Sequence, residues 1–167
     1  QIRQQADRLL QSEVADVDGN IESRKGTVSV FNGPEPSIQV VESQKEETKA
    51  IAAWLKERIA EGVVSHEIGV FVRSDAEMAR ARAAVAEAAL KAIELDDRTD
   101  TLPGSVSICT MHLAKGLEFR AVVVAACDDE IVPLQGRIQS VSDDSDLEEV
   151  YNTERQLLYV ACTRARD

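Results

Sequence analysis

The residues best suited to chemistry lie near the C-terminal end of this 167-residue chain. Arg164 and Arg166 follow a strongly apolar, amphipathic segment that begins at Asn152. A guanidinium held on a packed helix can donate two parallel hydrogen bonds to a phosphate, and it stays charged at any working pH. The same pair of arginines is also compatible with ordinary surface charge. A second group of residues, well upstream, favours the phosphate contact.

This second group directly follows a short apolar run. Thr110 and His112 stand where a predicted strand ends, and ligands of open parallel sheets bind at the carboxyl ends of the strands. Lys115 and His112 supply hydrogen-bond donors, and Gly116 permits close approach of the backbone to a ligand. Glu118 is an acceptor suited to ribose hydroxyls. The alternative is a tight turn from strand to helix, in which these polar residues only cap the turn.

Helix starts are predicted from three serines, each followed by a glutamate three residues later. Ser43, Ser74 and Ser145 fit this capping-box pattern, in which the two side chains satisfy free backbone amides. Apolar residues recur at intervals of three and four after each serine. Gly62 is expected to end the first helix. The third helix would carry the chain into the two arginines.

Short apolar runs between these helices predict strands. The runs are continuous rather than alternating, which is typical of parallel strands covered on both faces. They are Ile38–Val41, Ile68–Val72, Val106–Thr110 and Ala121–Ala126, with a weaker one at Ala92–Leu95. Strands that alternate with helices indicate a three-layer α/β fold with a mostly parallel sheet.

Two segments have less regular patterns. Gly19–Pro36 is predicted to be an irregular connection with a short strand at Thr27–Phe31, and Asp128–Asp144 is predicted to be a surface loop. The length suits one buried core, so residues 1–167 are interpreted as a single domain. The chain has no initiator methionine and opens in an apparent helix, so we expect a piece of a longer protein.

Composition limits the possible partners. A net charge of −11 argues against binding of nucleic acid over the whole surface, although it allows binding through a local basic patch. Apolar residues make up 44%, yet no apolar run approaches the roughly 20 residues of a membrane helix, so no membrane partner is expected. The three cysteines suit neither zinc nor a disulfide framework. They are interpreted as buried thiols in a reducing cytoplasm, and no metal site is predicted.

Several segments resemble superfamily 1 helicases of the UvrD/Rep/PcrA type. Thr110–Phe119 resembles motif V of that family, and Glu154–Arg166 resembles motif VI. Ile68–Ser74 is similar to motif IVa, and Gln1–Leu10 to the helix that follows motif IV. The resemblance covers nearly the whole chain. It implies the second, C-terminal RecA-like domain (2A) of a two-domain motor. The phosphate-loop pattern Gly-x-x-x-x-Gly-Lys-Ser/Thr does not occur in this chain.

The resemblance also implies roles at ATP. Arg164 would reach the γ-phosphate as an arginine finger, Glu118 would bond the ribose, and Gly116 would let the backbone close on the nucleotide. ATP and Mg²⁺ would be bound mainly by the N-terminal RecA-like domain of the same protein. Tyr159 is interpreted as mainly structural. Arg166 is open between a structural role and a nucleotide contact.

A second set of implied roles concerns single-stranded DNA. Thr110 and His112 would contact its phosphates, and Arg73 is a further candidate for the same role. Family members usually carry an inserted 2B subdomain between motifs IVa and V. Only Ser74–Ser105 separates the two here, so 2B is expected to be absent.

The leading hypothesis is therefore the C-terminal motor domain of an ATP-dependent DNA helicase or translocase, inactive as a fragment. A subunit of a helicase–nuclease is an alternative within the enzymes. A non-catalytic, helicase-like scaffold or regulatory module is an alternative from another class. A receiver-like α/β module would need an acidic pocket, which Asp128 and Asp129 could imitate, but the match to motif VI would then be coincidence.

Overall fold

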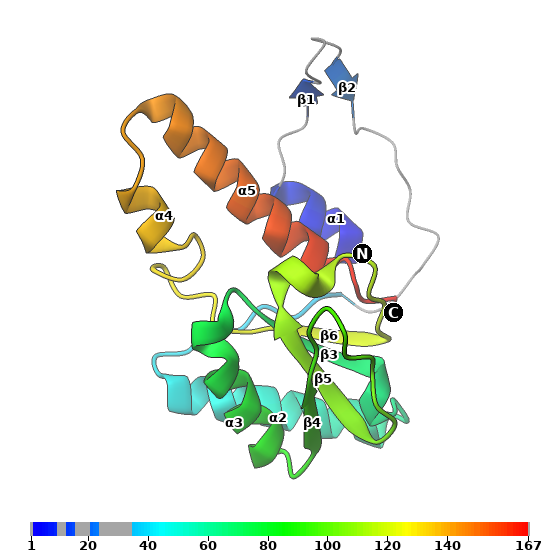
Figure 1. Cartoon of the computed structure of the whole chain (residues 1–167). Coiled ribbons are helices and arrows are strands. Elements are labelled where there is room, and N and C mark those ends of the chain that lie inside the picture. Colours follow the sequence, from blue (N-terminus) through cyan, green and yellow to red (C-terminus); the bar gives the residue numbers. More distant parts are fainter. Residues whose placement is uncertain (1, 10–12, 16–20, 24–34, 167) are drawn as a thin grey trace.

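A parallel sheet forms the centre of the fold, in a computed structural model that describes residues 2–9, 13–15, 21–23 and 35–166 (Figure 1). Its strand order is β4-β5-β3-β6. The strands are β3 (Ile68–Val72), β4 (Lys91–Glu94), β5 (Ser105–Thr110) and β6 (Ala121–Val124). All three pairings are parallel, and Val72 lies opposite Thr110 at the carboxyl ends of β3 and β5. The predicted α/β fold is confirmed, including the weak strand near Ala92.

Helices cover both faces of this sheet (Figure 1). Two of them, α2 (Gln44–Ala60) and α3 (Met78–Glu87), pack on one face, where Leu55 and Val85 are fully buried with Val70 of β3. The other face is covered by α5 (Asp144–Cys162) and by the 3₁₀ turn η4 (Met111–Ala114), whose buried side chains pack on Phe71 and Cys109. The remaining elements are α1 (Ile2–Ala6), η1 (Asp7–Leu9), η2 (Ser65–Glu67), η3 (Asp75–Glu77) and α4 (Gln135–Gln139).

Two of the three predicted helix starts are confirmed. The Ser43 hydroxyl accepts from the Glu46 amide at 3.3 Å and begins α2, which ends before Gly62 with its φ of 91°. Ser74 and Glu77 form a complete capping box at η3, which leads into α3. Short polar side chains at these positions satisfy amides that the first helical turn leaves without partners.

The bounds of α5 differ from the prediction at both ends. Asp143, not Ser145, is the N-cap, because its carboxylate accepts from the Asp146 amide at 2.9 Å. Aspartate caps helices as well as serine does, so the helix starts earlier than the serine pattern predicts. At the other end α5 stops at Cys162 and Thr163 caps it. Arg164 therefore lies beyond the helix rather than on it.

The predicted strand Ile38–Val41 is wrong. Residues 35–41 have no regular secondary structure, and the side chains of Ile38 and Val40 are 83% and 95% exposed. A run of β-branched residues favours a strand only where a neighbouring strand and a core receive it. Here the segment passes outside β6, the edge strand of the sheet, and its apolar side chains face solvent.

Two predicted irregular regions contain regular structure. Strand β2 (Ile21–Ser23) lies within the expected connection Gly19–Pro36 and pairs antiparallel with β1 (Glu13–Ala15). The short helix α4 lies within the expected loop Asp128–Asp144. The predicted strand Thr27–Phe31 lies outside the described residues.

Gly69, the second residue of β3, packs against an aromatic ring from the segment that resembles motif V. A Cβ at Gly69 would lie 2.6 Å from the Cδ2 atom of Phe119, which is closer than real Cβ contacts allow. Phe119 is 1% exposed and meets Phe71 edge to face, with ring centroids 5.9 Å apart. The absence of a side chain at Gly69 therefore fixes where Phe119, and the loop before it, can lie.

We expect Gly69→Ala to lower the free energy of unfolding by about 1–3 kcal/mol, because overpacking displaces the Phe119 ring. Urea denaturation followed by circular dichroism measures the change. Gly136→Ala is the matched control, since a Cβ there meets no atom within 4 Å and the residue lies in helix α4. Equal stability of Gly69→Ala and the unsubstituted chain would contradict this account of the packing.

Candidate nucleotide and nucleic-acid site

The two segments that the sequence singled out meet in the structure. The Phe119 amide donates to the Arg164 carbonyl at 2.9 Å, and the Arg166 amide donates to the Phe119 carbonyl at 2.8 Å. These bonds form a parallel bridge between Phe119 and Ala165. The backbone after α5 is therefore paired with the end of the Gly116–Phe119 loop, some 45 residues earlier in the chain.

The Arg164 side chain is held on this loop. It is partly buried, its Nε donates to the Val160 carbonyl at 3.1 Å, and its Nη1 is 3.5 Å from the Leu117 carbonyl. Leu117 lies between Gly116 and Glu118, both exposed, so the structure brings all three predicted nucleotide residues together. A guanidinium has five N–H donors, and these contacts use two.

Gly116 supports the shape of the loop through its backbone. Its φ of 85° is in the left-handed region that L side chains rarely adopt, while a Cβ would meet no atom within 4 Å. Conformation, rather than a lack of space, therefore favours glycine here.

Thr110 and His112 lie at the carboxyl ends of the strands, as predicted from the sequence. Thr110 is the last residue of β5 and is partly buried, and His112 is exposed in η4. Desolvation lowers the pKa of His112 below its ordinary 6.5, and the positive charges of Arg73 and Arg137 add to this effect. The negative charge of Glu154 opposes this shift without reversing it. The neutral form of His112 is therefore favoured, and its ring N–H can donate one hydrogen bond to an anion.

Arg73 is at this edge but points inward. Its side chain is 3% exposed, and its Nε and Nη2 donate to the two carboxylate oxygens of Glu154, each at 2.6 Å. Such a bidentate pair fixes the plane of the guanidinium. The arrangement favours a role for Arg73 in joining β3 to α5. Its contact with DNA stays a prediction.

Glu154 was not singled out from the sequence. Its carboxylate is 2% exposed and also accepts from the Leu134 amide at 3.4 Å and from Arg137 Nη1 at 3.2 Å. Burial opposes its ionisation, but the bonds and charge of Arg73 outweigh burial and lower the pKa of Glu154. The sequence did contain a sign that Glu154 is buried and paired. Glu154 lies on the apolar face of α5, between the buried Val150 and Ala161, where a charged residue needs a partner.

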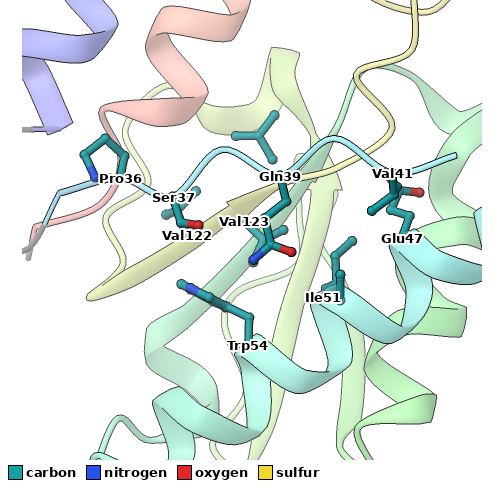
Figure 2. A pocket seen from close by; sticks show the side chains of 11 residues that line it. Pro36, Ser37, Gln39, Val41, Glu47, Ile51, Trp54, Val122 and Val123 are labelled. Atoms are coloured by element: carbon teal, nitrogen blue, oxygen red, sulfur yellow. The ribbon is translucent and has the colours of Figure 1, made fainter.

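A pocket of about 210 Å³ lies elsewhere, beside the edge strand β6. Residues 36–41 run along one side of it, and Ile51 and Trp54 of α2 line the other (Figure 2). None of the residues predicted to bind ATP or DNA lines this pocket. It is therefore separate from the site at the strand ends.

The cysteines only partly fit the expectation of buried thiols. Cys109 is fully buried, which raises the pKa of its thiol to about 12. Cys162 is partly buried, but Cys127 is exposed.

In the part of the chain that the structure describes, no group of three or more histidine, cysteine, aspartate or glutamate side chains could hold a metal ion. No helix in that part is long and apolar enough to cross a bilayer.

The fold is that of an α/β domain with a parallel sheet, and a parallel bridge between Phe119 and Ala165 joins the two segments that the sequence singled out. The chain belongs to the UvrD-like helicase C-terminal domain family, whose pattern matches residues 75–167, more than half of the chain. The matched region contains η4, the Gly116–Phe119 loop, α5 and, after its end, Arg164.

Individual relatives agree with this family. The chain is 39% identical over 81 residues to the ATP-dependent DNA helicase UvrD1 of Mycobacterium leprae, covering 46% of this chain and 10% of that protein. It is 42% identical over 71 residues to the ATP-dependent DNA helicase PcrA of Staphylococcus epidermidis, covering 42% and 9%. The chain thus spans about a tenth of the length of the curated relatives that it matches.

A solved structure has the same fold. The C-terminal domain of a possible DNA helicase from Lactobacillus plantarum superposes with a TM-score of 0.50. The match covers 73% of this chain and 63% of that one, at 22% identity. This likeness bears on the fold alone.

We expect Glu154→Gln to lower the free energy of unfolding by about 3–5 kcal/mol at pH 7, because it leaves the buried Arg73 charge without an anion. The pKa of Glu154 is lowered, so its ionised form contributes stability above the ordinary value of 4.5 and this contribution is lost as the pH falls through the lowered pKa. The difference between the two proteins should therefore shrink below pH 4.5.

Urea denaturation at pH 7 and at pH 4 or below measures this difference. The exposed Glu149→Gln on the same helix is the control and should change little at either pH. A constant difference across the pH range would show that the charge of Glu154 is not what stabilises the pair.

Proposed function

We propose that this chain is the C-terminal motor domain of an ATP-dependent DNA helicase or translocase. The observation that carries the proposal is the placement of Arg164 on the Gly116–Glu118 loop, held through the backbone pairing of Phe119. Membership of the family and the helicase names of the relatives support it.

In this proposal Arg164 acts on the γ-phosphate of ATP. Phosphoryl transfer develops charge on the phosphate oxygens, and a positioned arginine stabilises that charge, which raises the rate by about 10³–10⁵. The exposed Glu118 bonds the ribose, and Gly116 brings the backbone close to the nucleotide. The loop offers Mg²⁺ only the single carboxylate of Glu118. The metal, which neutralises phosphate charge when bound, is therefore assigned with the phosphate loop to the N-terminal RecA-like domain.

Hydrolysis then depends on closure between two domains. Arg164 comes from this domain and the triphosphate from the other, so the fragment alone is inactive. Single-stranded DNA crosses the carboxyl ends of β3 and β5, where Thr110 and His112 contact its phosphates. Closing and opening the cleft moves the DNA contacts of the two domains relative to each other, which converts ATP turnover into stepping along a strand. Residues 74–105 form η3, α3, β4 and a connection, so we propose that no 2B subdomain is inserted there.

We expect Arg164→Ala, in the full-length protein, to lower the DNA-stimulated ATPase rate by about 10³-fold or more. Binding of single-stranded DNA should change little, because the arginine contacts the nucleotide. A coupled ATPase assay and fluorescence anisotropy with an oligonucleotide measure the two quantities. Arg155→Ala, on the exposed side of α5, is the control. Unchanged turnover in Arg164→Ala would refute the arginine-finger role, and a wild-type protein without ATPase would favour a scaffold.

His112→Ala should weaken single-strand binding several-fold and slightly flatten its salt dependence. The effect should depend on pH. The lowered pKa favours neutral His112 in the free protein, and a bound phosphate raises this pKa, so proton uptake strengthens wild-type binding as the pH falls from 8 to 6. Anisotropy titrations at both pH values measure this gain. If His112→Ala still bound more tightly at pH 6 than at pH 8, the proton would be taken up by another group.

A further inference from the structure

The buried carboxylate of Glu154 is shared by two guanidinium groups. Arg73 and Arg137 both donate to it, so this cluster holds two positive charges and one negative charge. The excess positive charge is unusual in a chain with a net charge of −11. It lies at the carboxyl ends of the strands, since Arg73 directly follows Val72 of β3, the neighbour of Thr110.

The two arginines are not equivalent. Arg73 is 3% exposed and binds both carboxylate oxygens at 2.6 Å, whereas the Arg137 side chain is 38% exposed and makes one longer contact, at 3.2 Å from its Nη1 atom. The negative charge of Glu154 is therefore neutralised mainly by Arg73. The excess positive charge is displayed to solvent by Arg137.

Arg137 is close to the residues that the proposed function places on DNA. It belongs to α4, and the Leu134 amide just before that helix also donates to Glu154. The charge of Arg137 acts on His112, whose pKa it helps to lower. Geometry gives the same placement: Arg137 contacts Glu154, Glu154 binds Arg73, and Arg73 directly follows Val72, which pairs with Thr110. Arg137 is therefore tied to the sheet edge at which Thr110 stands, two residues before His112.

We propose that Arg137 contacts a phosphate of the bound single strand, next to the phosphate contacted by Thr110 and His112. The contact with Glu154 keeps the guanidinium at the edge of the sheet while it retains donors for an oxygen of the phosphate. Arginine suits this task because its charge is permanent and its donors match phosphate oxygens in pairs. The inference rests on the proposed function and adds a contact from α4, which the motifs do not include.

The test uses the full-length protein and an oligothymidine, with dissociation constants measured by anisotropy over a series of salt concentrations. Arg137→Ala should weaken binding several-fold and reduce the slope of log K against log[salt] by about 0.7, the value for one phosphate of a single strand. Arg137→Lys should retain most of the slope, because it keeps the charge.

Arg82→Ala is the matched control. Arg82 is also an exposed arginine paired with a glutamate, Glu94, but it lies on α3, on the other face of the sheet. A salt slope unchanged in Arg137→Ala, or reduced equally in Arg82→Ala, overturns the inference. If Arg137 only joined α4 to α5, the variants would melt at lower temperature and keep the wild-type slope, which also overturns it.

The proposed function can fail separately. If the wild-type protein neither binds the oligothymidine nor shows ATPase stimulated by it, the motor assignment fails, and this inference fails with it. If the wild type does both and Arg137→Ala behaves identically, only the contact from α4 is refuted.

Discussion

The buried ion pair between Arg73 and Glu154 is the interaction on which the arrangement of the site depends. It joins the end of a central strand to the middle of the helix that precedes Arg164. Taking two charges out of water is costly, and the cost is offset only where geometry is good and the remaining lone pairs are bonded. Glu154 meets this condition with bonds from Arg73, Leu134 and Arg137. An apolar pair could stabilise α5 equally well, but it would not specify one orientation so closely.

A second constraint acts at the far end of α5. There the chain leaves the helix and pairs with Phe119, whose ring occupies the space over Gly69. The helix is thus fixed to the sheet at two points, by charge near its middle and by backbone bonds just past its end. Arg164 lies next to the second point and Arg137 contacts the first. Arg164, which we place on ATP, and Arg137, which we place on DNA, are thus both held by contacts with this helix.

Much of this could be predicted from the sequence, because the signals are local. Continuous apolar runs gave the parallel strands, and the serine caps at Ser43 and Ser74 gave two helix starts. The helicase family was predicted from the resemblance of Thr110–Phe119 and Glu154–Arg166 to its motifs V and VI. The inward orientation of Arg73 could not be predicted, since it depends on a partner 81 residues away. The run Ile38–Val41 has the composition of a strand, and only the position of β6 decides whether it pairs.

The end of α5 also escaped prediction, because the helix was expected to continue into the two arginines, whereas it ends at Cys162 with Thr163 as its C-cap. The bridge between Phe119 and Ala165 has an evolutionary consequence. Two motifs far apart in the chain share main-chain hydrogen bonds, which any residue with a backbone N–H can make. The bridge therefore constrains the backbone path and the length of both segments more than their side chains. An insertion or deletion within either segment would break this pairing, whereas substitution of an exposed side chain such as Glu118 would leave it intact.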